Sequence, residues 1–365
     1  MIVVAGEALI DLVPAEQTAG REPRSLAEQT AERGPLSEAR PVAGDNAVDG
    51  PGPTRPGREV DGAGSAARSR VVDGPGPVRG GGLPALLPRL GGGPFNTALA
   101  LGRLGSPVAF CSRVSTDAFG EALLRGLRAE GVDTALVQRG DEPTTLAVAA
   151  VTPDGSAGYG FYAEGTADRL FALPGPLPEA ARAVALGTCS LVLEPGASAY
   201  ERLLRRESER GLCTVLDPNI RPGLIPDADA YRARFRSWLP YTTLLKLSEE
   251  DAAWLGGSPR DWLAAGPAAV VLTHGADGLR VWTRDGGEVS VPGEPVEVVD
   301  TIGAGDTVTA ALLHRLAAHD ALSPEAVPQL PAATWQDTLT YASRAAAVTC
   351  TRPGAEPPYA AELQD

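Results

Sequence analysis

The sequence predicts an α/β protein built on a doubly wound, mostly parallel sheet with helices on both faces. Short apolar segments of strand length alternate along the chain with segments whose apolar residues follow helical spacing. Such alternation is typical of a parallel sheet covered by helices. Residues 212–216 are apolar almost throughout, as in a strand that is buried on both faces. The 365 residues, of which 43% are hydrophobic, suffice for one large domain or two small ones.

The chain begins with a predicted strand at residues 2–5, and residues 6–13 are expected to continue it, with Asp11 offering a carboxylate near its end. Residues 15–88 differ in character, because they are rich in Gly, Pro, Ala, Arg and acidic residues and repeat the hexapeptide Val-Asp-Gly-Pro-Gly-Pro. A segment of this composition buries too little apolar surface to offset its ordering entropy, so we predict that most of it is disordered.

Order is predicted to return at the glycines 91–93, which precede a compact helix that ends at Gly105. A run of glycines lets the backbone approach a ligand closely, and Asn96 would present its amide from the first helical turn. Further strands are predicted at 108–111, 146–151, 159–162, 183–186, 191–193, 212–216, 243–247 and 268–273, with helices at 119–131, at 200–210 and after the acidic run 248–251. A hairpin should form around 153–155, and 279–282 should pair with 288–291.

The most informative stretch is Asp300-Thr301-Ile302-Gly303-Ala304-Gly305-Asp306. Residues 296–299 are predicted to be a strand before it, and apolar residues with helical spacing follow it. Small residues there leave the N–H groups of the first helical turn uncovered, and these form an anion site with the helix dipole. A carboxylate would repel an anion bound at this site, so its presence requires a functional reason. Phosphoryl transfer gives such a reason if Asp306 accepts the proton of an attacking hydroxyl. The alternative is an ordinary glycine turn with a capping Asp306.

Charge and cysteine usage restrict the class of protein. The net charge of −14 and the pI near 4.8 argue against a general binder of nucleic acids or anionic membranes. An anionic substrate such as ATP must therefore be bound by a local nest and a metal. The four cysteines lack paired spacing, which indicates reduced thiols. The sequence has no basic leader and no apolar run of membrane-spanning length, so a cytoplasmic location is expected.

Several signatures together are similar to those of the ribokinase-like, or PfkB-type, carbohydrate kinases, and most of all to bacterial fructokinases. They are the opening 6–11, the Gly-Gly-Gly-Pro-Phe-Asn segment within 91–105, the stretch 299–306 and the ending 345–357. The resemblance implies a kinase domain at 1–14 and 89–360 with a ribokinase-like fold and a small β lid. The low-complexity segment 15–88 would be an insertion in the lid region, where the family often forms a homodimer contact.

The resemblance also implies roles for individual residues. Asp306 would be the catalytic base, with Gly303, Ala304 and Gly305 as the anion hole, and sugar hydroxyls would bind to Asp11, Gly92, Gly93 and Asn96. The nucleotide, its phosphates and Mg²⁺ would lie near Asp217, Asn219, Arg221, Ser248, Asp251, Thr273, Gly275 and Gly278. Asp300, Ile302 and the loop after Cys350 resemble a monovalent-cation site suited to K⁺. Ser248 and Asp251 stand where the commonest version of the motif has Asn and Glu.

The implied activity is ATP-dependent phosphorylation of a hydroxymethyl group on a small sugar, with fructose as the first candidate. Kinases of 2-keto-3-deoxygluconate, ribose and nucleosides are alternatives. Ala163 weakens the first of these, because some relatives have an arginine there for a sugar acid. A non-catalytic sugar- or nucleotide-binding relative is an alternative of another class. A Rossmann-type dehydrogenase is disfavoured because no GxGxxG follows the first strand, and a P-loop is excluded because GxxxxGK(S/T) is missing.

Overall fold

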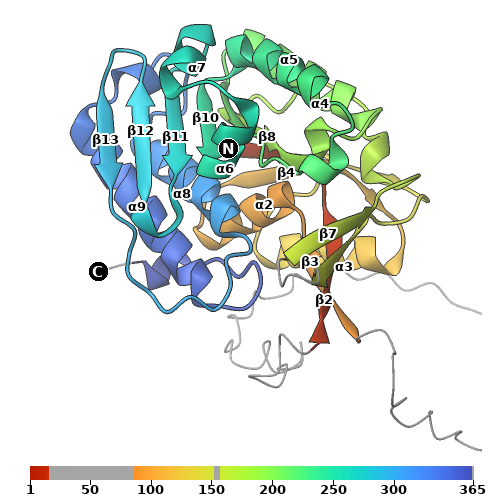
Figure 1. Cartoon of the computed structure of the whole chain (residues 1–365). Coiled ribbons are helices and arrows are strands. Elements are labelled where there is room, and N and C mark those ends of the chain that lie inside the picture. The colour runs from red at the N-terminus through yellow and green to blue at the C-terminus, as the bar shows by residue number, and fades with distance from the viewer. Residues whose placement is uncertain (16–84, 152–156, 364–365) are drawn as a thin grey trace, which may run out of the picture. The chain divides into compact units, whose positions relative to one another are not determined.

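The computed structural model describes residues 1–15, 85–151 and 157–363 (Figure 1). The predicted hairpin turn at 153–155 and nearly all of the predicted insertion at 15–88 lie outside these residues. The contacts of the chain group residues 1–15 and 86–365 into one compact unit. Within this unit, the structure extends the ordered part upstream of the predicted boundary, because strand β3 begins at Leu86.

A nine-stranded sheet forms the centre of this unit, with the strand order β13-β12-β11-β10-β9-β8-β1-β4-β5. Its strands are β1 (Ile2–Ala5), β4 (Val108–Ser115), β5 (Val137–Gly140), β8 (Ala183–Gly187), β9 (Cys213–Asp217), β10 (Leu244–Ser248), β11 (Ala269–Thr273), β12 (Leu279–Thr283) and β13 (Glu288–Val291). The strands from β11 to β5 in this order run parallel, and the β12–β13 hairpin adds an antiparallel edge. Both the parallel sheet and the antiparallel pair agree with the sequence prediction.

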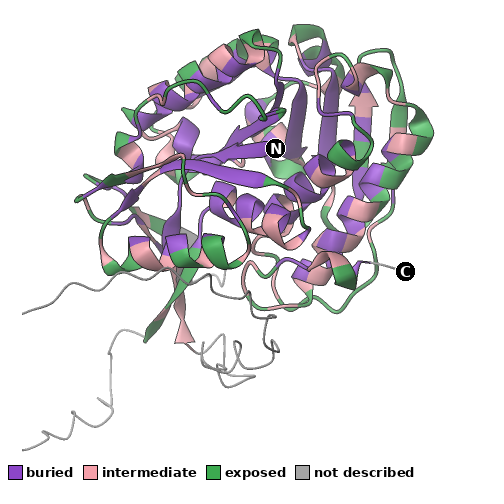
Figure 2. Ribbon diagram, turned by 180° about the vertical axis from the view of Figure 1, so that it is seen from behind, coloured by how far each residue is buried: buried purple, intermediate pink, exposed green. Residues whose placement is uncertain are grey.

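Helices cover both faces of this sheet (Figure 1). One face carries α2 (Gly93–Arg103), α3 (Ala118–Ala129), α8 (Ala304–Ala318) and α9 (Ala332–Cys350), and the other carries α4 (Gly196–Glu209), α5 (Ala228–Trp238), α6 (Glu249–Leu255) and α7 (Pro259–Ala265). Alternate strand residues point to opposite faces, so that Ile2 and Val4 join one core whereas Val3 and Ala5 join the other. Figure 2 shows the strands buried between the two helical layers.

A second, four-stranded sheet has the order β3-β2-β6-β7. It consists of β2 (Leu9–Pro14), β3 (Leu86–Gly91), β6 (Leu146–Val151) and β7 (Ala157–Tyr162), and β6 and β7 form the predicted hairpin. We call this sheet the lid. Short 3₁₀ helices complete the unit: η2 (Asp168–Leu170), η3 (Thr188–Leu191), η4 (Pro222–Leu224), η5 (Leu239–Tyr241), η6 (Gly275–Asp277), η7 (Val327–Gln329) and η8 (Ala360–Glu362).

Residues 6–13 do not continue the first strand, contrary to the prediction. The chain leaves the central sheet at Gly6, and β2 starts in the lid three residues later. Gly6 has φ 153°, and a Cβ there would lie 2.3 Å from Cγ of Pro94. The apolar pattern runs through both strands, but the close packing of Gly6 against α2 forces the chain to change sheets.

Two other predicted strands are absent from the structure. Leu191 is the last residue of η3, and residues 192–193 form a turn after it, so that 191–193 do not pair with a strand. Residues 296–299 form no strand, although they are β-branched and apolar. Val298 and Val299 are 58% and 60% exposed, and the amides of Val299 and Asp300 both donate to the carbonyl of Cys350 at the end of α9. Here contacts with α9 override the local β propensity.

Candidate active site

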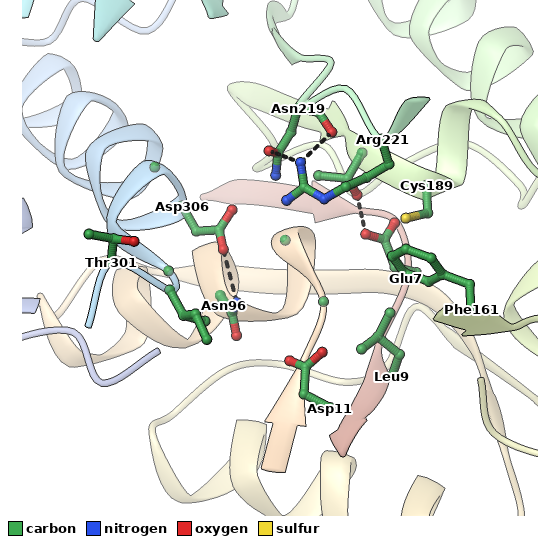
Figure 3. A pocket seen from close by; sticks show the side chains of 16 residues that line it. Glu7, Leu9, Asp11, Asn96, Phe161, Cys189, Asn219, Arg221, Thr301 and Asp306 are labelled. Atoms are coloured by element: carbon green, nitrogen blue, oxygen red, sulfur yellow. Dashed lines mark hydrogen bonds between the residues drawn. The ribbon is translucent and has the colours of Figure 1, made fainter. Parts of the chain in front are cut away.

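Two adjoining cavities lie beyond the carboxyl ends of the parallel strands, where ligands bind in folds of this type. The first has a volume of about 300 Å³ and lies between the central sheet and the lid. It is lined by Glu7, Leu9, Asp11, Gly92, Gly93, Asn96, Phe161, Thr188, Cys189, Asn219, Arg221, Thr301, Ile302, Gly303, Gly305 and Asp306 (Figure 3). The second, of about 360 Å³, is lined by Asn219, Lys246, Ser248, Glu249, Glu250, Asp251, Thr273, His274, Gly275, Thr301 and Gly305. Gly305 therefore lines both cavities.

Asp306 occupies the first turn of α8, and its carboxylate faces the first cavity (Figure 3). The helix begins after Gly303, whose φ of 78° is left-handed and where a Cβ would lie 2.5 Å from that of Ala355. Glycine is therefore required at the turn that aims the helix N-terminus at the cavity. The Nδ2 of Asn96 donates a hydrogen bond of 2.9 Å to Asp306 Oδ2. This bond fixes the carboxylate between α2 and α8.

The surroundings of Asp306 raise its pKa to about 7. Burial is the largest cause, because it disfavours the charged carboxylate, and the negative charge of Asp217 acts in the same direction. The hydrogen bond from Asn96 and the positive charges of Lys246 and Arg221 act in the opposite direction. A carboxylate with a pKa near neutrality can accept a proton and release it again at physiological pH.

Some of the backbone amides predicted to form the anion hole already donate a hydrogen bond, and others do not. The amide of Ala304 donates to the carbonyl of Thr301 at 3.2 Å, so it is already engaged within the turn. Within the described part of the chain, the amide of Gly305 has no acceptor. The structure thus offers Gly303 and Gly305, and not Ala304, as free donors at the N-terminus of α8 among the described residues.

The glycine run at 91–93 brings the backbone close to two carboxylates. A Cβ on Gly91 would lie 2.0 Å from Asp11 Oδ2, and one on Gly93 would lie 3.1 Å from Asp306 Oδ1. Burial raises the pKa of Asp11 to about 6, against the opposing charge of Arg221. Gly92, Gly93, Asn96 and Asp11 all line the first cavity, so the structure brings together the four residues predicted to contact a sugar.

The second cavity collects most of the residues predicted for the nucleotide. Ser248 and Asp251 form a capping box at the start of α6. Asp251 Oδ1 also accepts a 2.7 Å bond from the amide of Ile220, which ties the loop after β9 to this helix. Thr273 and Gly275 also line this cavity, and Asn219 lines both cavities.

Four predicted residues do not line either cavity: Ala304 of the first turn of α8, and Asp217, Gly278 and Asp300. Asp217 is buried beneath them and accepts hydrogen bonds from Lys246 and Thr309. Gly278 lies in the turn between β11 and β12, where a Cβ would be 2.1 Å from the carbonyl oxygen of Val291. Asp300 accepts bonds from the amides of Ile302 and Gly354, and so joins the turn before α8 to the loop after Cys350.

Sequence reasoning assigned no role to several residues that line the cavities. Glu7 is 2% exposed, and its carboxylate accepts hydrogen bonds from Ser190 and from the hydroxyl of Thr188. Burial raises the pKa of Glu7. Phe161 and Cys189 also contribute to the first cavity, and Lys246 and His274 to the second. A charged residue inside an apolar strand is the signal that could have identified Lys246.

The doubly wound sheet, the small lid and the two adjoining cavities suit an enzyme that brings two small molecules together next to Asp306. Residues 86–361 match the family described as "pfkB family carbohydrate kinase". The chain belongs to this family, which confirms the resemblance seen in the sequence. Among the described residues, no helix has the length and apolar character needed to cross a membrane.

Relatives with curated names include several fructokinases. The chain is 40% identical to a fructokinase of Rhizobium leguminosarum bv. trifolii over 252 residues, which cover 67% of this chain and 76% of that protein. It is 32% identical to fructokinase-1 of Oryza sativa subsp. japonica over 293 residues, which cover 77% and 88% of the two chains.

Solved structures with the same fold also include fructokinases. The fructokinase of Xylella fastidiosa with bound ATP superposes with a TM-score of 0.71 and 24% identity, covering 99% of this chain and 97% of the other. A fructokinase double mutant of Vibrio cholerae bound to fructose, ADP and a potassium ion gives a TM-score of 0.71 at 22% identity, with 99% and 96% covered. These likenesses confirm the predicted fold class.

Proposed function

We propose that this protein transfers the terminal phosphoryl group of ATP to a hydroxymethyl group of fructose. The observation that carries the proposal is the position of Asp306, whose carboxylate faces the first cavity next to Gly305, one of three residues that line both cavities. A sugar in the first cavity and a nucleotide in the second would meet at this point. The curated relatives named as fructokinases support fructose as the acceptor.

In the proposed reaction, the carboxylate of Asp306 accepts the proton of the sugar hydroxyl. The hydroxyl oxygen attacks the terminal phosphorus of ATP and forms a new O–P bond. The bond between that phosphorus and the β,γ-bridging oxygen breaks, and ADP leaves with the bonding electrons. The free amide of Gly305 and the positive end of α8 stabilise the charge on the moving phosphoryl group.

Mg²⁺ fits the donors around the second cavity. Glu249, Glu250 and Asp251 supply carboxylates there. Both oxygens of Asp251 already accept backbone amides, which leaves their remaining lone pairs for water. Mg²⁺ is usually held by substrate phosphates, waters and one or two carboxylates, so we propose that it binds to ATP and reaches Asp251 through water. The ion would neutralise phosphate charge during transfer.

We further propose that K⁺ binds between the turn 300–302 and the loop after Cys350. Asp300 already joins these two segments through bonds to Ile302 and Gly354, and backbone carbonyls there are suitable ligands for a monovalent ion. The relative from Vibrio cholerae with a bound potassium ion supports this proposal.

The insertion 15–88 and the quaternary structure are part of the same proposal. We place the insertion between β2 and β3 of the lid, and we propose a homodimer formed through this sheet. Leu86 and Leu90 of β3 are each 37% exposed, which supports an apolar contact there. The measurement of this oligomeric state is the molar mass in solution by light scattering.

Because the reaction consumes ATP, we propose the cytoplasm as the location of the protein.

The function is tested by coupled ADP release with Mg²⁺-ATP on fructose, ribose, 2-keto-3-deoxygluconate and adenosine, with and without K⁺. We expect turnover on fructose to exceed that on the other acceptors. Preference for another acceptor would replace fructose as the proposed substrate, but the proposed phosphoryl transfer would stand. If ATP binds and none of the acceptors is phosphorylated, the non-catalytic alternative is favoured.

A further inference from the structure

Lys246 is the only lysine of the chain, because the 32 lysine and arginine residues are otherwise all arginine. Lysine and arginine differ chemically: the ammonium group is a compact point charge with three donors, whereas the guanidinium group is a broad planar fork. Because every other strongly basic side chain of this sequence is arginine, we expect the site of Lys246 to need an ammonium group.

The ammonium group of Lys246 is buried in the wall between the two cavities. Lys246 lies in β10 and is 3% exposed. Its Nζ donates a 2.9 Å bond to Asp217 Oδ2. A Cβ on Gly305 would lie only 3.0 Å from Nζ, so the ammonium group packs against the first turn of α8.

Two of the three donors of Lys246 remain available. One N–H reaches Asp217, and the other two meet no acceptor among the residues that the structure describes. Burial disfavours the charged form, but the attraction of Asp217, Asp306 and Asp251 outweighs it and raises the pKa of Lys246. The side chain is therefore charged at neutral pH, and it lines the second cavity.

We propose that Lys246 is a catalytic residue that donates hydrogen bonds to a non-bridging oxygen of the terminal phosphate of ATP. This inference rests on the proposed phosphoryl transfer and extends it. The terminal phosphate must lie beside Gly305 to reach the first cavity, and Nζ lies behind this glycine on the nucleotide side. An ammonium group there neutralises charge on the phosphoryl group throughout its transfer.

Asp217 acts through Lys246 as a positioning residue. Its Oδ2 also accepts a 3.0 Å bond from Thr309 of α8, which fixes the carboxylate relative to the helix that carries Asp306. Asp217 thus holds the ammonium group against Gly305 before the nucleotide arrives. Its other oxygen, Oδ1, is buried and has no hydrogen-bond partner among the described residues.

The test measures binding of nucleotides by calorimetry in the presence of Mg²⁺ and without an acceptor sugar. The probes are ADP and the non-hydrolysable ATP analogue AMP-PNP. For Lys246→Met we expect about tenfold or greater loss of affinity for AMP-PNP, as for a lost hydrogen bond to a charged group, and about twofold or smaller change for ADP. A purely structural role would change both affinities alike, and that result would overturn the proposal.

Two variants guard against misfolding and indirect effects. Lys246→Met leaves Asp217 buried without its cation, so the double variant Lys246→Met/Asp217→Asn removes both charges of this ion pair together. We expect it to fold and to show the same selective loss of AMP-PNP binding. The matched control Thr309→Val removes the other bond to Asp217 but keeps the ammonium group, and it should retain the preference for AMP-PNP. Equal loss in the control would also contradict the proposal.

The single lysine also permits direct observation. Protein labelled with ¹⁵N-lysine contains one side-chain ammonium nitrogen, and its resonance should shift on addition of AMP-PNP and much less with ADP. Equal shifts would argue against contact with the terminal phosphate. If the wild-type protein binds neither nucleotide, the proposed function itself fails; if it binds both and phosphorylates a sugar while Lys246→Met behaves as the wild type, only the role of Lys246 fails.

Discussion

The amide of Asn96 and the carboxylate of Asp306 are joined by a 2.9 Å hydrogen bond between residues that lie 210 positions apart in the chain. Asn96 is in the first turn of α2 and Asp306 in the first turn of α8, so two helix N-termini meet at one carboxylate. Both side chains are less than one-tenth exposed. The bond aims Asp306 at the first cavity, and α2 brings the glycines 92 and 93 to the same place.

Replacement of Asp306 by Asn should remove the proton acceptor while preserving the shape of the site. We expect kcat to fall about 10²- to 10⁴-fold, which is the usual contribution of general base catalysis, and sugar and nucleotide affinities to change little. Turnover is measured by ADP release and binding by calorimetry. Near-normal turnover would contradict the assignment of Asp306 as the base.

The pH dependence of turnover should follow the titration of Asp306. The base must be deprotonated to accept a proton, and its pKa is raised to about 7. We therefore expect kcat/KM for the sugar to rise with pH up to about 7 and to level off above it. The check is a profile of initial rates from pH 5 to 9. An acidic limb centred near pH 4, as for an unperturbed aspartate, would show that the buried environment does not control the reaction.

The same pKa shift predicts that Asp306 destabilises the fold at neutral pH. An acid whose pKa is higher in the folded state binds its proton more tightly there, so stability falls as pH rises from about 4, the unfolded value, to about 7. Asp306→Asn should therefore increase the free energy of unfolding by about 4 kcal/mol at pH 8 and by little at pH 4. Urea unfolding at the two pH values measures the difference. An equal difference in unfolding free energy between variant and wild type at both pH values would show that the raised pKa of Asp306 is not the cause.

Gly91 is predicted to control the position of Asp11 through its lack of a side chain. Gly91→Ala would place a Cβ 2.0 Å from Asp11 Oδ2 and so displace the carboxylate. We expect KM for the sugar to rise about tenfold, as for loss of one hydrogen bond to a charged group, with KM for ATP unchanged. Gly175→Ala is the matched control, because no atom lies within 4 Å of its added Cβ. Equal effects of the two variants would refute a specific role for Gly91.

Local patterns predicted those parts of the site that the backbone builds by itself. The glycine run before α2, the turn before α8 and the capping pair Ser248 and Asp251 are short segments whose geometry follows from their own residues. Lys246 and Glu7 could not be placed in this way, because their partners Asp217 and Ser190 are brought to them by sheet packing. The strand predicted at 296–299 failed for a similar reason, since the C-terminal end of α9 binds its backbone.

Asp300 is predicted to couple activity to K⁺. Its carboxylate holds the amides of Ile302 and Gly354 at 3.0 and 2.8 Å, which brings together the two segments of the proposed ion site. Asp300→Ala should lower kcat about tenfold or more and remove any activation by K⁺, because the loop after Cys350 is no longer fixed. The measurement is ADP release across a series of K⁺ concentrations. Unaltered activation by K⁺ in this variant would place the ion elsewhere.

The insertion is predicted to be dispensable for phosphoryl transfer. Pro14 and Leu86 are opposite each other in the antiparallel register of β2 and β3, so a short turn can connect the two strands. We expect a protein in which residues 16–84 are replaced by a four-residue turn containing Asn-Gly to keep its melting temperature and its kcat within about twofold. Thermal unfolding and ADP release measure the two quantities, and light scattering shows whether the mass in solution changes. A folded, inactive protein would show that the insertion takes part in catalysis. An active protein with altered mass would instead assign it to contact between subunits.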